Sequence, residues 1–353
     1  MRTVSIRASR SYEVRIGSGL LPDLGAQLRD LFAAPRSVMV VSDDTVSALY
    51  GPAAERSLRD AGFRPERFVF PHGERSKTLS TYAALQQALL AAGFTRSDLI
   101  VALGGGVAGD LAGFAAATYQ RGIPYVQVPT TLLAAVDSSV GGKTAVDLPG
   151  GKNQVGAFYQ PALVLCDPGL LHSLPPQEYQ NGCAEIAKYA MLSGEPLYSA
   201  LLSEPVSRQP EPVIAACVEI KRDLVQADEL DTGCRRLLNF GHTVGHAIES
   251  CSHYAVSHGP AVAIGMAVLT RAACRRGLCT SETFSALERL LAAYDLPTHT
   301  EFSAQAIARA ALSDKKRRGD ALSIILPAAP GRCRVETIPA RDLVSWLRDG
   351  GLS

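Results

Sequence analysis

The chain has no long hydrophobic run and almost no excess of charge of either sign. No segment reaches the about eighteen uninterrupted apolar residues that a membrane-spanning helix needs, and the first residues lack the apolar stretch of a signal peptide. Lys and Arg number 35 against 34 for Asp and Glu, so no overall field attracts nucleic acid or anionic lipid. These absences predict a cytoplasmic protein that acts on a small molecule, without a nucleic-acid or membrane partner.

Paired cysteines are also missing, because the eight Cys are scattered without a CxxC motif. A chain of 353 residues, 47% of them hydrophobic, can bury a stable core without disulfides. We therefore predict that the cysteines are reduced and mostly buried. Internal repeats and low-complexity tracts are absent as well, and the length favours two domains.

The first half of the chain alternates short apolar runs with helical patterns. Val4–Arg7 and Tyr12–Ile16 alternate like an antiparallel hairpin, and Thr78–Ala92 has helical periodicity. Five further segments are predicted strands: Ser37–Val41, Arg67–Phe70, Asp98–Leu103, Tyr125–Val128 and Leu163–Cys166. The alternation predicts an α/β domain over residues 1–168 with a mainly parallel, doubly wound sheet.

The second half changes character after a Leu-Pro-Pro sequence near residue 175. From there to about residue 312, helical patterns rich in Ala, Leu, Glu and Arg leave almost no strand signal. Leu322–Leu326 and Cys333–Thr337 form a late hairpin pattern before a last helix, Ala340–Arg348. We expect an all-α C-terminal domain over residues 169–353 that carries this hairpin.

A glycine-rich turn follows one predicted strand, where Gly104-Gly105-Gly106 precedes a helix that starts near Val107. Glycines permit close approach and positive φ, and the helix N-terminus carries about half a positive charge, so the turn suits a diphosphate. Since the spacing is not GxGxxG, a tight turn without a ligand is the alternative. Two other predicted strands are followed by charged residues, the first by Asp43 and the second by Glu74 and Lys77. These residues either bind ribose or are solvated turn residues.

A second glycine-rich passage runs from Val128 to Pro161 and is long for a compact domain, which is typical of functional loops. Two Gly-Lys dipeptides flank one hairpin in it, although ordinary surface lysines are the alternative. Groups suited to phosphates and hydroxyls near a cofactor are Thr130, Thr131, Asp137, Lys143, Lys152 and Asn153.

The most informative segment is CRRLLNFGHTVGHAIES. In a helix, its strongly polar side chains would share one face, because they recur at steps of four and three: Arg235, Asn239, His242, His246 and Glu249. A polar face turned inward needs polar partners, and Gly241 and Gly245 indicate close packing against another element. A solvent-facing stripe is the alternative.

Two histidines four residues apart on a helix can share a metal ion, and a catalytic zinc site adds a carboxylate and an open position. The spacing leaves His242 and His246 equally eligible. Glu185 lies one turn from Lys188 in an otherwise apolar helix, where an unpaired carboxylate is costly to bury. His258 opens another predicted helix. Glu, His and His from three helices would form a zinc site that binds hydroxyl oxygens and lowers their pKa.

These segments resemble the 3-dehydroquinate synthase family over nearly the whole chain. GGGVAGD, the run from RGIPYVQVPTT to NQVGAFYQP, AEIAKY and LLNFGHTVGHAIE carry the resemblance, in matching order and spacing. It implies an N-terminal α/β domain that binds NAD, a helical C-terminal domain and an active site in the cleft between them. The implied reaction is a lyase step of the shikimate pathway, in which 3-deoxy-D-arabino-heptulosonate 7-phosphate becomes 3-dehydroquinate and phosphate.

The resemblance assigns Glu185, His242 and His258 as ligands of zinc, or of cobalt, and leaves His246 for proton transfer. Positions that correspond to NAD-binding residues are Asp43, Glu74, Lys77, Gly105, Gly106, Asp110, Thr130, Thr131, Asp137, Lys143 and Lys152. Positions that correspond to substrate contacts are Arg121, Asp137, Lys143, Asn153, Lys188, Lys221, Arg235, Asn239, His246, Lys315 and Lys316. The catalytic residues implied among them are Lys143, Asn153, Lys188, Arg235, Asn239 and His246. Arg121 would reach the phosphate site of a neighbouring subunit, which implies a homodimer.

The implied substrate carries a carboxylate, a phosphate and vicinal hydroxyls. Lys221 and Arg235, with Lys315 or Lys316, suit the carboxylate. The residues that suit the phosphate are Arg121, Lys143, Asn153 and Asn239. NAD would oxidise one hydroxyl and so acidify the neighbouring C–H, phosphate would leave by β-elimination, the hydride would return, and the opened ring would close by an aldol step.

The chain departs from the family at His258-Gly259-Pro260, where Gly-Glu usually follows the histidine. Proline suits an early helical position, but a carboxylate that could orient a metal ligand is then missing. His253 is a second histidine close by in the sequence.

Three alternative functions share these residues. One is another sugar phosphate cyclase, such as an aminodehydroquinate or a deoxy-inosose synthase. Lys221 and Arg235 favour a substrate with a carboxylate, which argues against the deoxy-inosose synthase. The substrate of an aminodehydroquinate synthase also has a carboxylate, so that alternative stays open. A metal-dependent polyol dehydrogenase would accumulate NADH. The third is a binding protein that has lost activity.

Overall fold

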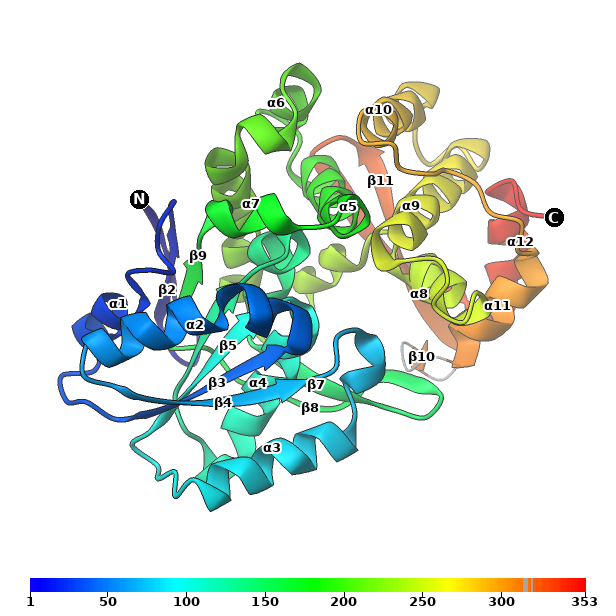
Figure 1. Ribbon diagram of the computed structural model, residues 1–353. Coiled ribbons are helices and arrows are strands. Elements are labelled where there is room, and N and C mark those ends of the chain that lie inside the picture. Colours follow the sequence, from blue (N-terminus) through cyan, green and yellow to red (C-terminus); the bar gives the residue numbers. More distant parts are fainter. Residues whose placement is uncertain (314–316, 319) are drawn as a thin grey trace. The chain divides into compact units, whose positions relative to one another are not determined.

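The computed structural model of the chain describes residues 1–313, 317–318 and 320–353, which fall into two compact units (Figure 1). The first unit comprises Met1–Leu174 and Lys221–Leu230, and the second comprises Pro175–Ile220 and Asp231–Ser353. Instead of the single boundary expected after residue 168, the chain therefore enters the second unit, returns to the first and leaves it again.

The returning segment Lys221–Leu230 is anchored to the first unit by side chains. Gln226 Oε1 accepts a hydrogen bond at 2.7 Å from the backbone N–H of Arg7, which is 219 residues away in the sequence. Glu229 accepts two more from Ser9, at 2.8 Å from N and 2.6 Å from Oγ. Because these contacts are so distant along the chain, no local pattern could predict them.

A seven-stranded sheet is the centre of the first unit. Its strands are β1 Arg2–Ile6, β2 Tyr12–Ile16, β3 Ser37–Asp43, β4 Arg64–Phe70, β5 Leu99–Gly104, β6 Tyr125–Pro129 and β9 Leu163–Cys166. Their order is β1-β2-β9-β6-β5-β3-β4. β1 and β2 pair antiparallel, and every other neighbouring pair is parallel. The predicted strands and the opening hairpin are confirmed, with small shifts at their ends.

Helices cover both faces of this sheet (Figure 1). They are α1 Leu24–Leu31, α2 Asp44–Asp60, α3 Leu79–Ala91 and α4 Gly106–Thr118. Val38 and Val40 pack with α1 and α2, whereas Met39 and Val41 pack with α3 and α4. Successive side chains of a strand point to opposite faces, so a continuously apolar strand fills both cores. The doubly wound sheet is thereby confirmed.

The glycine-rich passage from residue 128 to 161 is more ordered than a loop. It contains the π-helical turn η3 Ala134–Ser138 and the antiparallel strands β7 Lys143–Leu148 and β8 Gly151–Phe158. Short 3₁₀ turns elsewhere in this unit are η1 Glu74–Ser76, η2 Tyr119–Arg121 and η4 Pro168–Ser173. The predicted hairpin is confirmed. One Gly-Lys dipeptide lies at the start of β7, but the other lies at the start of β8, next to the turn, so the two do not flank the hairpin.

The second unit is helical, as expected. Its helices are α5 Pro176–Ser193, α6 Leu197–Ser203, α7 Pro210–Ala227, α8 His242–Cys251, α9 His258–Arg275, α10 Ser281–Ala292, α11 Ala304–Ser313 and α12 Leu343–Asp349, with 3₁₀ turns η5 Val206–Arg208, η6 Cys234–Asn239 and η7 Ala340–Asp342. The division between the units falls within α7. The predicted late hairpin is confirmed as β11 Ala321–Ala329 and β12 Arg332–Pro339, beside the short strand β10 Arg317–Arg318.

The helices α8 and α9 cross closely because both carry glycine at the crossing. A Cβ added to Gly265 of α9 would collide with Gly241 O, and one added to Gly245 of α8 would lie 3.0 Å from the Cα of Val262. The close packing predicted from Gly241 and Gly245 is confirmed. It brings the N-terminal residues of α8 and α9 together.

The prediction of one polar helical face from Arg235 to Glu249 is wrong. η6 ends at Asn239, and α8 begins only at His242. Gly241 between them has φ of +80°, in the left-handed region, which ends the first helical turn and turns the chain before the second begins. Arg235 and Asn239 therefore lie on a different element from the two histidines.

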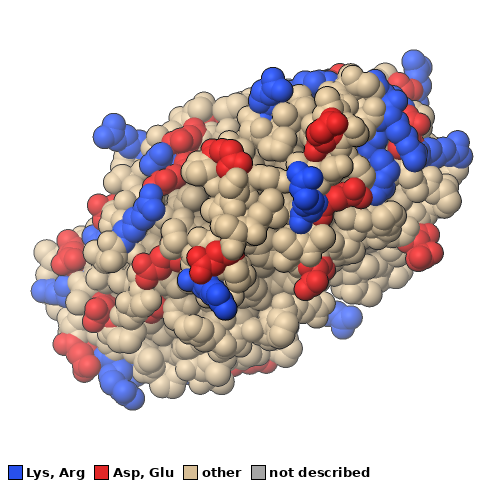
Figure 2. Space-filling view, turned by 90° about the horizontal axis from the view of Figure 1, so that it is seen from above, with Lys and Arg blue, Asp and Glu red and all other residues tan. Residues whose placement is uncertain are grey.

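Within residues 1–313, 317–318 and 320–353, no helix is long and apolar enough to cross a membrane. Charged side chains of both signs are interspersed over the face seen in Figure 2. The formal net charge of the whole chain is +1.

Candidate functional site

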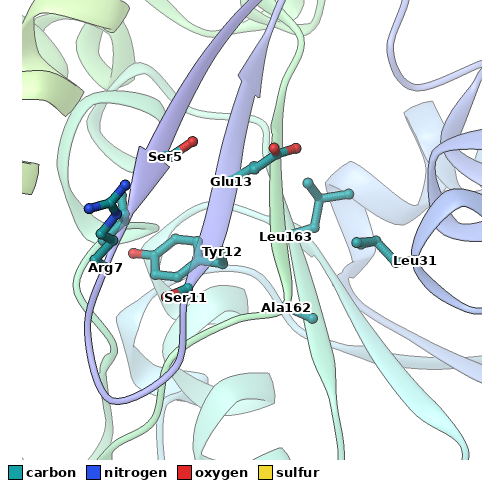
Figure 3. A pocket seen from close by; sticks show the side chains of 9 residues that line it. Ser5, Arg7, Ser11, Tyr12, Glu13, Leu31, Ala162 and Leu163 are labelled. Carbon is teal, nitrogen blue, oxygen red and sulfur yellow. The ribbon is translucent and has the colours of Figure 1, made fainter.

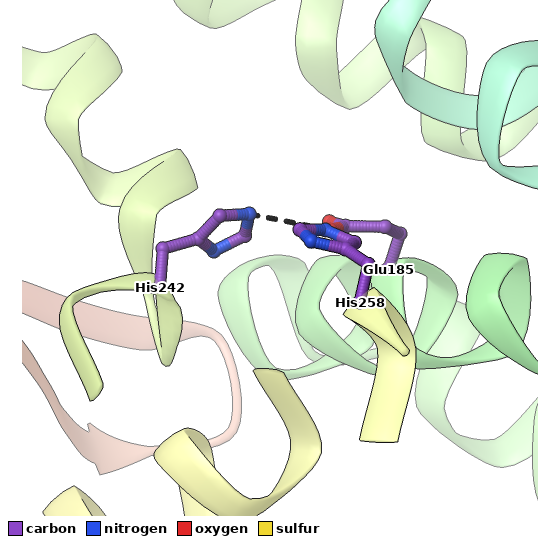
Figure 4. Close-up of side chains that lie close together, drawn as sticks. All are labelled: Glu185, His242 and His258. Carbon is purple, nitrogen blue, oxygen red and sulfur yellow. Dashed lines mark hydrogen bonds and ion pairs between the residues drawn. The ribbon is translucent and has the colours of Figure 1, made fainter. Parts of the chain in front are cut away.

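Three helices of the second unit bring one carboxylate and two imidazoles together (Figure 4). Glu185 comes from α5, and His242 and His258 are the first residues of α8 and α9. Glu185 Oε1 lies 2.9 Å from His258 Nε2 and 3.2 Å from His242 Nε2. One ligand atom from each residue lies within 4.8 Å of the other two. The group has the geometry to hold a metal ion.

The carboxylate of this group is buried and ionised. Glu185 and Lys188 are each 1% exposed, and the Lys188 ammonium pairs with Glu185 Oε2. Burial by itself would raise the pKa of Glu185, but the charges of Lys188 and His242 outweigh it and hold that pKa well below its usual value. Glu185 therefore presents a negative oxygen to both histidines.

His242 presents a lone pair to the same oxygen. Its Nδ1 lies 3.1 Å from the carbonyl oxygen of Phe240, which can only accept, so Nδ1 carries the proton. Burial lowers the pKa of His242, against the influence of Glu185, and keeps the ring neutral. The unprotonated Nε2 then faces Glu185 Oε1 across 3.2 Å. Two acceptors at this distance repel each other unless a cation lies between them.

His258 is oriented by a second carboxylate. Its Nδ1 lies 3.5 Å from Oε1 of Glu249, which is 3% exposed on α8. Burial would lower the pKa of His258, but Glu185 and Glu249 raise it to about 9. The expectation that the change to Pro260 leaves no orienting carboxylate is wrong, because Glu249 takes this role from another helix. Pro260 itself lies in the first turn of α9, as predicted.

His246 lies beside the same cluster. Its ring centroid is 5.4 Å from that of His242 and 6.1 Å from that of His258, and its Nε2 is 4.0 Å from Glu249 Oε2. His246, Glu249 and His258 also have ligand geometry, so the structure contains two overlapping groups that share His258. His253 is exposed and belongs to neither group.

The remaining predicted residues of the second unit differ in burial. Arg235 in η6 is 1% exposed. Asn239 at the end of η6 is half-buried and donates from Nδ2 to Arg236 O at 3.2 Å. Lys315 and Lys316 lie outside the described residues.

The glycine-rich turn of the first unit joins β5 to α4. Gly105 is the N-cap of α4 and has extended backbone angles, φ −78° and ψ −164°. A Cβ on Gly105 would lie 2.9 Å from Thr131 Cγ2, and one on Gly106 would lie 3.3 Å from Ser138 Oγ. None of the three glycines has a positive φ, and glycine is required here by the close approach of neighbouring side chains.

Polar side chains gather at the carboxyl ends of the adjacent strands. Asp43 ends β3, and its Oδ1 accepts from Val46 N at 2.9 Å, which caps α2. Thr131 Oγ1 accepts from Ala134 N at 3.1 Å. Thr130 is 3% exposed, and its Oγ1 has no hydrogen-bond partner among the described residues. This edge is where doubly wound sheets bind ligands.

A buried lysine organises the second predicted group of this unit. Lys77 is 4% exposed, and its Nζ lies 2.5 Å from Asp110 Oδ2 and donates to Asn153 Oδ1 at 2.5 Å. Glu74 Oε1 is 3.9 Å from Lys77 Nζ and 3.3 Å from Lys152 Nζ. Burial would lower the pKa of Lys77, but the charges of Asp110 and Glu74 raise it. These five predicted residues, from three segments of the sequence, thus form one network of ion pairs and a hydrogen bond.

Lys221 and Asp137 form another buried pair. The Lys221 ammonium contacts the Asp137 carboxylate and donates to the Asp137 carbonyl oxygen at 2.7 Å. Lys143 is exposed at the start of β7. Asn153 is held with φ of +54° by a 2.6 Å hydrogen bond from its backbone N–H to Asp147 Oδ1. Asp147 was missed by sequence reasoning, since no motif singles it out.

A hollow of about 390 Å³ lies at the opposite ends of the parallel strands (Figure 3). Tyr12 and Leu163, at the amino ends of β2 and β9, are among its lining residues. Because doubly wound sheets bind ligands at the carboxyl ends, this hollow is separate from the polar edge described above.

Comparison with solved structures first defines a class, the sugar phosphate cyclases. A crystal structure of 2-deoxy-scyllo-inosose synthase with carbaglucose-6-phosphate, NAD+ and Co2+ matches with a TM-score of 0.88 and 30% identity, covering 99% of this chain and 100% of the other. ValA, a 2-epi-5-epi-valiolone synthase from Streptomyces hygroscopicus subsp. jinggangensis 5008 with NAD+ and Zn2+ bound, matches with a TM-score of 0.86 and 28% identity over 99% of both chains. An NADH-dependent butanol dehydrogenase from Thermotoga maritima shares the fold at 14% identity and a TM-score of 0.67, covering 96% of both chains.

Sequence comparison then defines the family. The family descriptions "3-dehydroquinate synthase N-terminal" and "3-dehydroquinate synthase C-terminal" match residues 67–181 and 182–317. A 3-dehydroquinate synthase from Enterococcus faecalis is 43% identical over 351 residues, 98% of each chain, and one from Geobacter metallireducens is 46% identical over 341 residues, 92% of this chain and 93% of the other. The chain belongs to the 3-dehydroquinate synthase family.

Proposed function

We propose that the chain converts 3-deoxy-D-arabino-heptulosonate 7-phosphate to 3-dehydroquinate and phosphate. The observation that carries this proposal is the convergence of Glu185, His242 and His258 in a chain that is 43% and 46% identical to curated 3-dehydroquinate synthases over nearly its whole length. The inosose and valiolone synthases are less similar, at 30% and 28% identity. Sequence similarity therefore favours the carboxylate-bearing substrate of the family.

Glu185, His242 and His258 are the proposed ligands of Zn2+ or Co2+. Their fit to a divalent cation rests on the facing acceptors: without a cation, the lone pair of His242 Nε2 meets an ionised Glu185 oxygen at 3.2 Å. Two imidazoles and one carboxylate are a ligand set of catalytic zinc sites, and imidazole also suits neighbouring transition metals. The two cyclase structures contain Co2+ and Zn2+.

The carboxyl edge of the first unit's sheet is the proposed NAD site. Its fit rests on the buried hydroxyl of Thr130, which lacks a partner among the described residues, and on the N-terminus of α4 at Gly105. Asp43 Oδ2, at the end of the neighbouring strand β3, lies 3.8 Å from where a Cβ of Gly104 would be. The residues proposed to hold the dinucleotide are Asp43, Glu74, Lys77, Gly105, Gly106, Asp110, Thr130, Thr131, Asp137, Lys143 and Lys152.

When bound, NAD takes up and returns a hydride, and the metal ion polarises a substrate hydroxyl. The chain's own residues bind the substrate and move protons. We assign proton transfer to His246, because its half-buried ring lies next to both histidine ligands and its Nε2 is 4.0 Å from Glu249. Lys188, whose ammonium pairs with Glu185, is proposed to bind a substrate oxygen.

Arg235 and Asn239 are proposed to bind the anionic groups of the substrate. A guanidinium that is 1% exposed suits a carboxylate or phosphate, because bidentate hydrogen bonds are strong where water is excluded. In the first unit, Asp137, Lys143, Asn153 and Lys221 are proposed substrate contacts. The substrate carboxylate would have to share Lys221 with Asp137, its present partner. Contact from Lys315 or Lys316 stays a prediction.

A homodimer is also proposed, with Arg121 reaching the neighbouring subunit. Support comes from the backbone, since Arg121 is exposed and has φ of +66°, a conformation that costs a non-glycine residue about 1–3 kcal/mol. Arg96 donates two hydrogen bonds to the carbonyl oxygen of Gln120, at 3.2 and 2.9 Å, and so helps to hold the turn. Strain of this kind is typical of functional sites.

The test is phosphate release by chelator-treated protein that has been reloaded with Zn2+ and given NAD and the heptulosonate phosphate. We expect stoichiometric phosphate and 3-dehydroquinate, with no accumulation of NADH. Glucose 6-phosphate, which lacks the carboxylate, is the control substrate and should release none. Net NADH formation would instead support a polyol dehydrogenase, and release from glucose 6-phosphate alone would support an inosose synthase. No release from either by folded, metal-loaded protein would contradict the proposal.

A further inference from the structure

The eight cysteines are all free thiols, but they differ in exposure. Cys166, Cys183 and Cys217 are buried, and Cys234 is exposed. The half-buried thiols are Cys251, Cys274, Cys279 and Cys333. The prediction that the cysteines are mostly buried is therefore correct for three of them only.

Two of the half-buried thiols lie together in the second unit. The sulphur atoms of Cys274 and Cys279 are 3.0 Å apart, about 1 Å more than the disulfide bond length of about 2.0 Å. Cys274 lies in the last turn of α9, and Cys279 lies in the short connection to α10. Bond formation would therefore require only a small movement of the two side chains.

The end of α9 explains why these thiols meet. Gly277 has φ of +68°, and its N–H donates to Cys274 O at 3.0 Å, while Leu278 N donates to Ala273 O at 2.9 Å. This pair of hydrogen bonds is the glycine-terminated helix end that turns the chain back over its last helical turn. Leu278 and Cys279 both pack against the hydrophobic core of this unit, which keeps the connection in place.

Backbone carbonyl groups hold both sulphur atoms where they are. Cys274 Sγ donates to Thr280 O at 3.0 Å, and Cys279 Sγ lies 3.7 Å from Thr270 O. Thr280 is the N-cap of α10, so both ends of the connection belong to regular helices. The proximity of the thiols is thus a product of local backbone geometry and does not depend on a ligand.

We propose that Cys274 and Cys279 are a redox-active dithiol, which a peroxide oxidises to a reversible intramolecular disulfide. In the first step the Cys274 sulphur attacks hydrogen peroxide, an S–O bond forms, the O–O bond breaks, and one water leaves after protonation. In the second step the Cys279 sulphur attacks the sulfenic sulphur of Cys274, the S–S bond forms, and the oxygen leaves as a second water. Two electrons pass from the thiols to the peroxide, and a small dithiol reductant reverses the reaction by thiol–disulfide exchange.

The order of attack follows from the surroundings of Cys279. Burial, and then the neighbouring Cys274, raise the pKa of Cys279 to about 12, so this thiol keeps its proton and is the slower to meet peroxide. It attacks instead the sulfenic acid of Cys274. The short distance between the two sulphur atoms makes this reaction fast although the pKa of Cys279 is raised.

The dithiol is well separated from the candidate metal site along α9. The helix begins at His258, and sixteen residues at a rise of about 1.5 Å each place Cys274 about 24 Å further along its axis. Disulfide formation should therefore leave metal content and phosphate release unchanged, which distinguishes it from oxidative damage at the metal ligands.

The test is peroxide treatment of the metal-loaded protein, followed by alkylation, proteolysis and mass spectrometry. We expect a peptide pair linked through Cys274 and Cys279, two fewer alkylated cysteines than in the reduced protein, and full recovery with a dithiol. Loss of the thiols in wild type should be at least tenfold faster than further oxidation of Cys274 to sulfinic acid.

Two variants give the controls. Cys279→Ser should abolish the linked peptide and let Cys274 proceed to sulfinic acid, whereas Cys234→Ser, which removes the exposed thiol, should leave the linkage unchanged. The linked peptide in wild type does not depend on the folding of any variant. Peroxide treatment that modifies Cys234 or joins two chains, and leaves Cys274 and Cys279 as separate thiols, would overturn the proposal.

Discussion

Two buried polar clusters, one in each unit, satisfy their charges in different ways. In the first unit, the Lys77 ammonium lies between Asp110 and the Asn153 side chain, so a cation already separates the acceptors. In the second unit, Glu185 faces the lone pair of His242, and no cationic side chain of the described residues lies between them, since Lys188 contacts the other carboxylate oxygen. The first cluster is electrostatically complete, and the second is completed by a proton or a metal ion.

This difference indicates separate roles for the two clusters. A closed ion-pair network such as that of Lys77 holds the backbone of the β7–β8 hairpin through Asn153. Converging ligand atoms repel one another, and a cation relieves this repulsion. Metal binding therefore adds to stability by an amount that grows with the logarithm of the free metal concentration. Substitutions and pH changes should therefore act on the two clusters in distinguishable ways.

The largest effect is expected from Glu185→Gln, which removes a proposed metal ligand and also leaves the Lys188 ammonium buried without this carboxylate. Breaking a buried pair in this way costs about 3–5 kcal/mol of stability. Phosphate release should fall by more than about 100-fold, because loss of a direct ligand exceeds the 10–100-fold effect of losing its supporting group. Metal content by mass spectrometry and urea unfolding measure the two parts. A variant that retains stoichiometric zinc would remove Glu185 from the metal site.

Lys77→Met should destabilise the first unit by up to about 3–5 kcal/mol, because the half-buried Asp110 carboxylate loses the ammonium that pairs with it. Unlike the effect of Glu185→Gln, this loss should be the same with zinc and with chelator. Lys143→Met, at an exposed lysine, is the control and should change stability by less than about 0.5 kcal/mol. Equal unfolding midpoints for the two variants would show that the Lys77 network contributes nothing to stability.

The pH dependence of the metal-free protein should report His258. Its pKa, raised to about 9 by Glu185 and Glu249, exceeds the ordinary value of 6.5, so its protonated form stabilises the fold fully below pH 6.5 and loses this contribution as the pH rises through 9. The fall should be on the order of 3 kcal/mol. His242 acts in the opposite direction, because its pKa is lowered only in the folded state and its contribution to stability therefore rises as the pH passes 6.5, so a net fall belongs to His258.

Urea unfolding at pH 6 and pH 9 measures this change. Saturating zinc should abolish it, because the metal replaces the proton, and His258→Gln should abolish it as well. His253→Gln alters an exposed histidine and should leave the trend intact. A fall of the same size in zinc-loaded and metal-free protein would assign the titration to another group.

The smallest effect is expected from Glu249→Gln, which keeps the shape of the side chain and removes the charge that faces His258 Nδ1. Metal affinity should fall by about 10–100-fold with all three ligands still in place. Titration with Co2+, followed by its visible absorption, measures the affinity and the ligand field together. Glu301→Gln, at an exposed glutamate, is the matched control. An affinity equal to wild type would leave Glu249 with a role in packing only.

The strands and most helices could be predicted because their signals are local. Val38 to Val41 are continuously apolar, as a strand covered on both faces must be, and Pro176 opens α5 in the expected place. The polar stripe was mistaken for one helix because residue spacing alone cannot show that Gly241 adopts a left-handed conformation. The return of Lys221–Leu230 to the first unit was not predictable either, since it depends on side-chain hydrogen bonds to residues near the N-terminus.

The amino-acid sequence by itself determined the α/β and helical halves, the family, and the set of residues from which a metal site could be built. It left His242 and His246 equally eligible as ligands until family resemblance separated them, because spacing along a helix says nothing about what lies opposite. Only the tertiary structure decided that Glu185 meets the Nε2 atoms of His242 and His258, and that Glu249 supports His258 in place of a carboxylate at position 260. These outcomes depend on how closely α8 and α9 cross, which is set by packing at Gly241, Gly245 and Gly265 and by contacts between elements far apart in the chain.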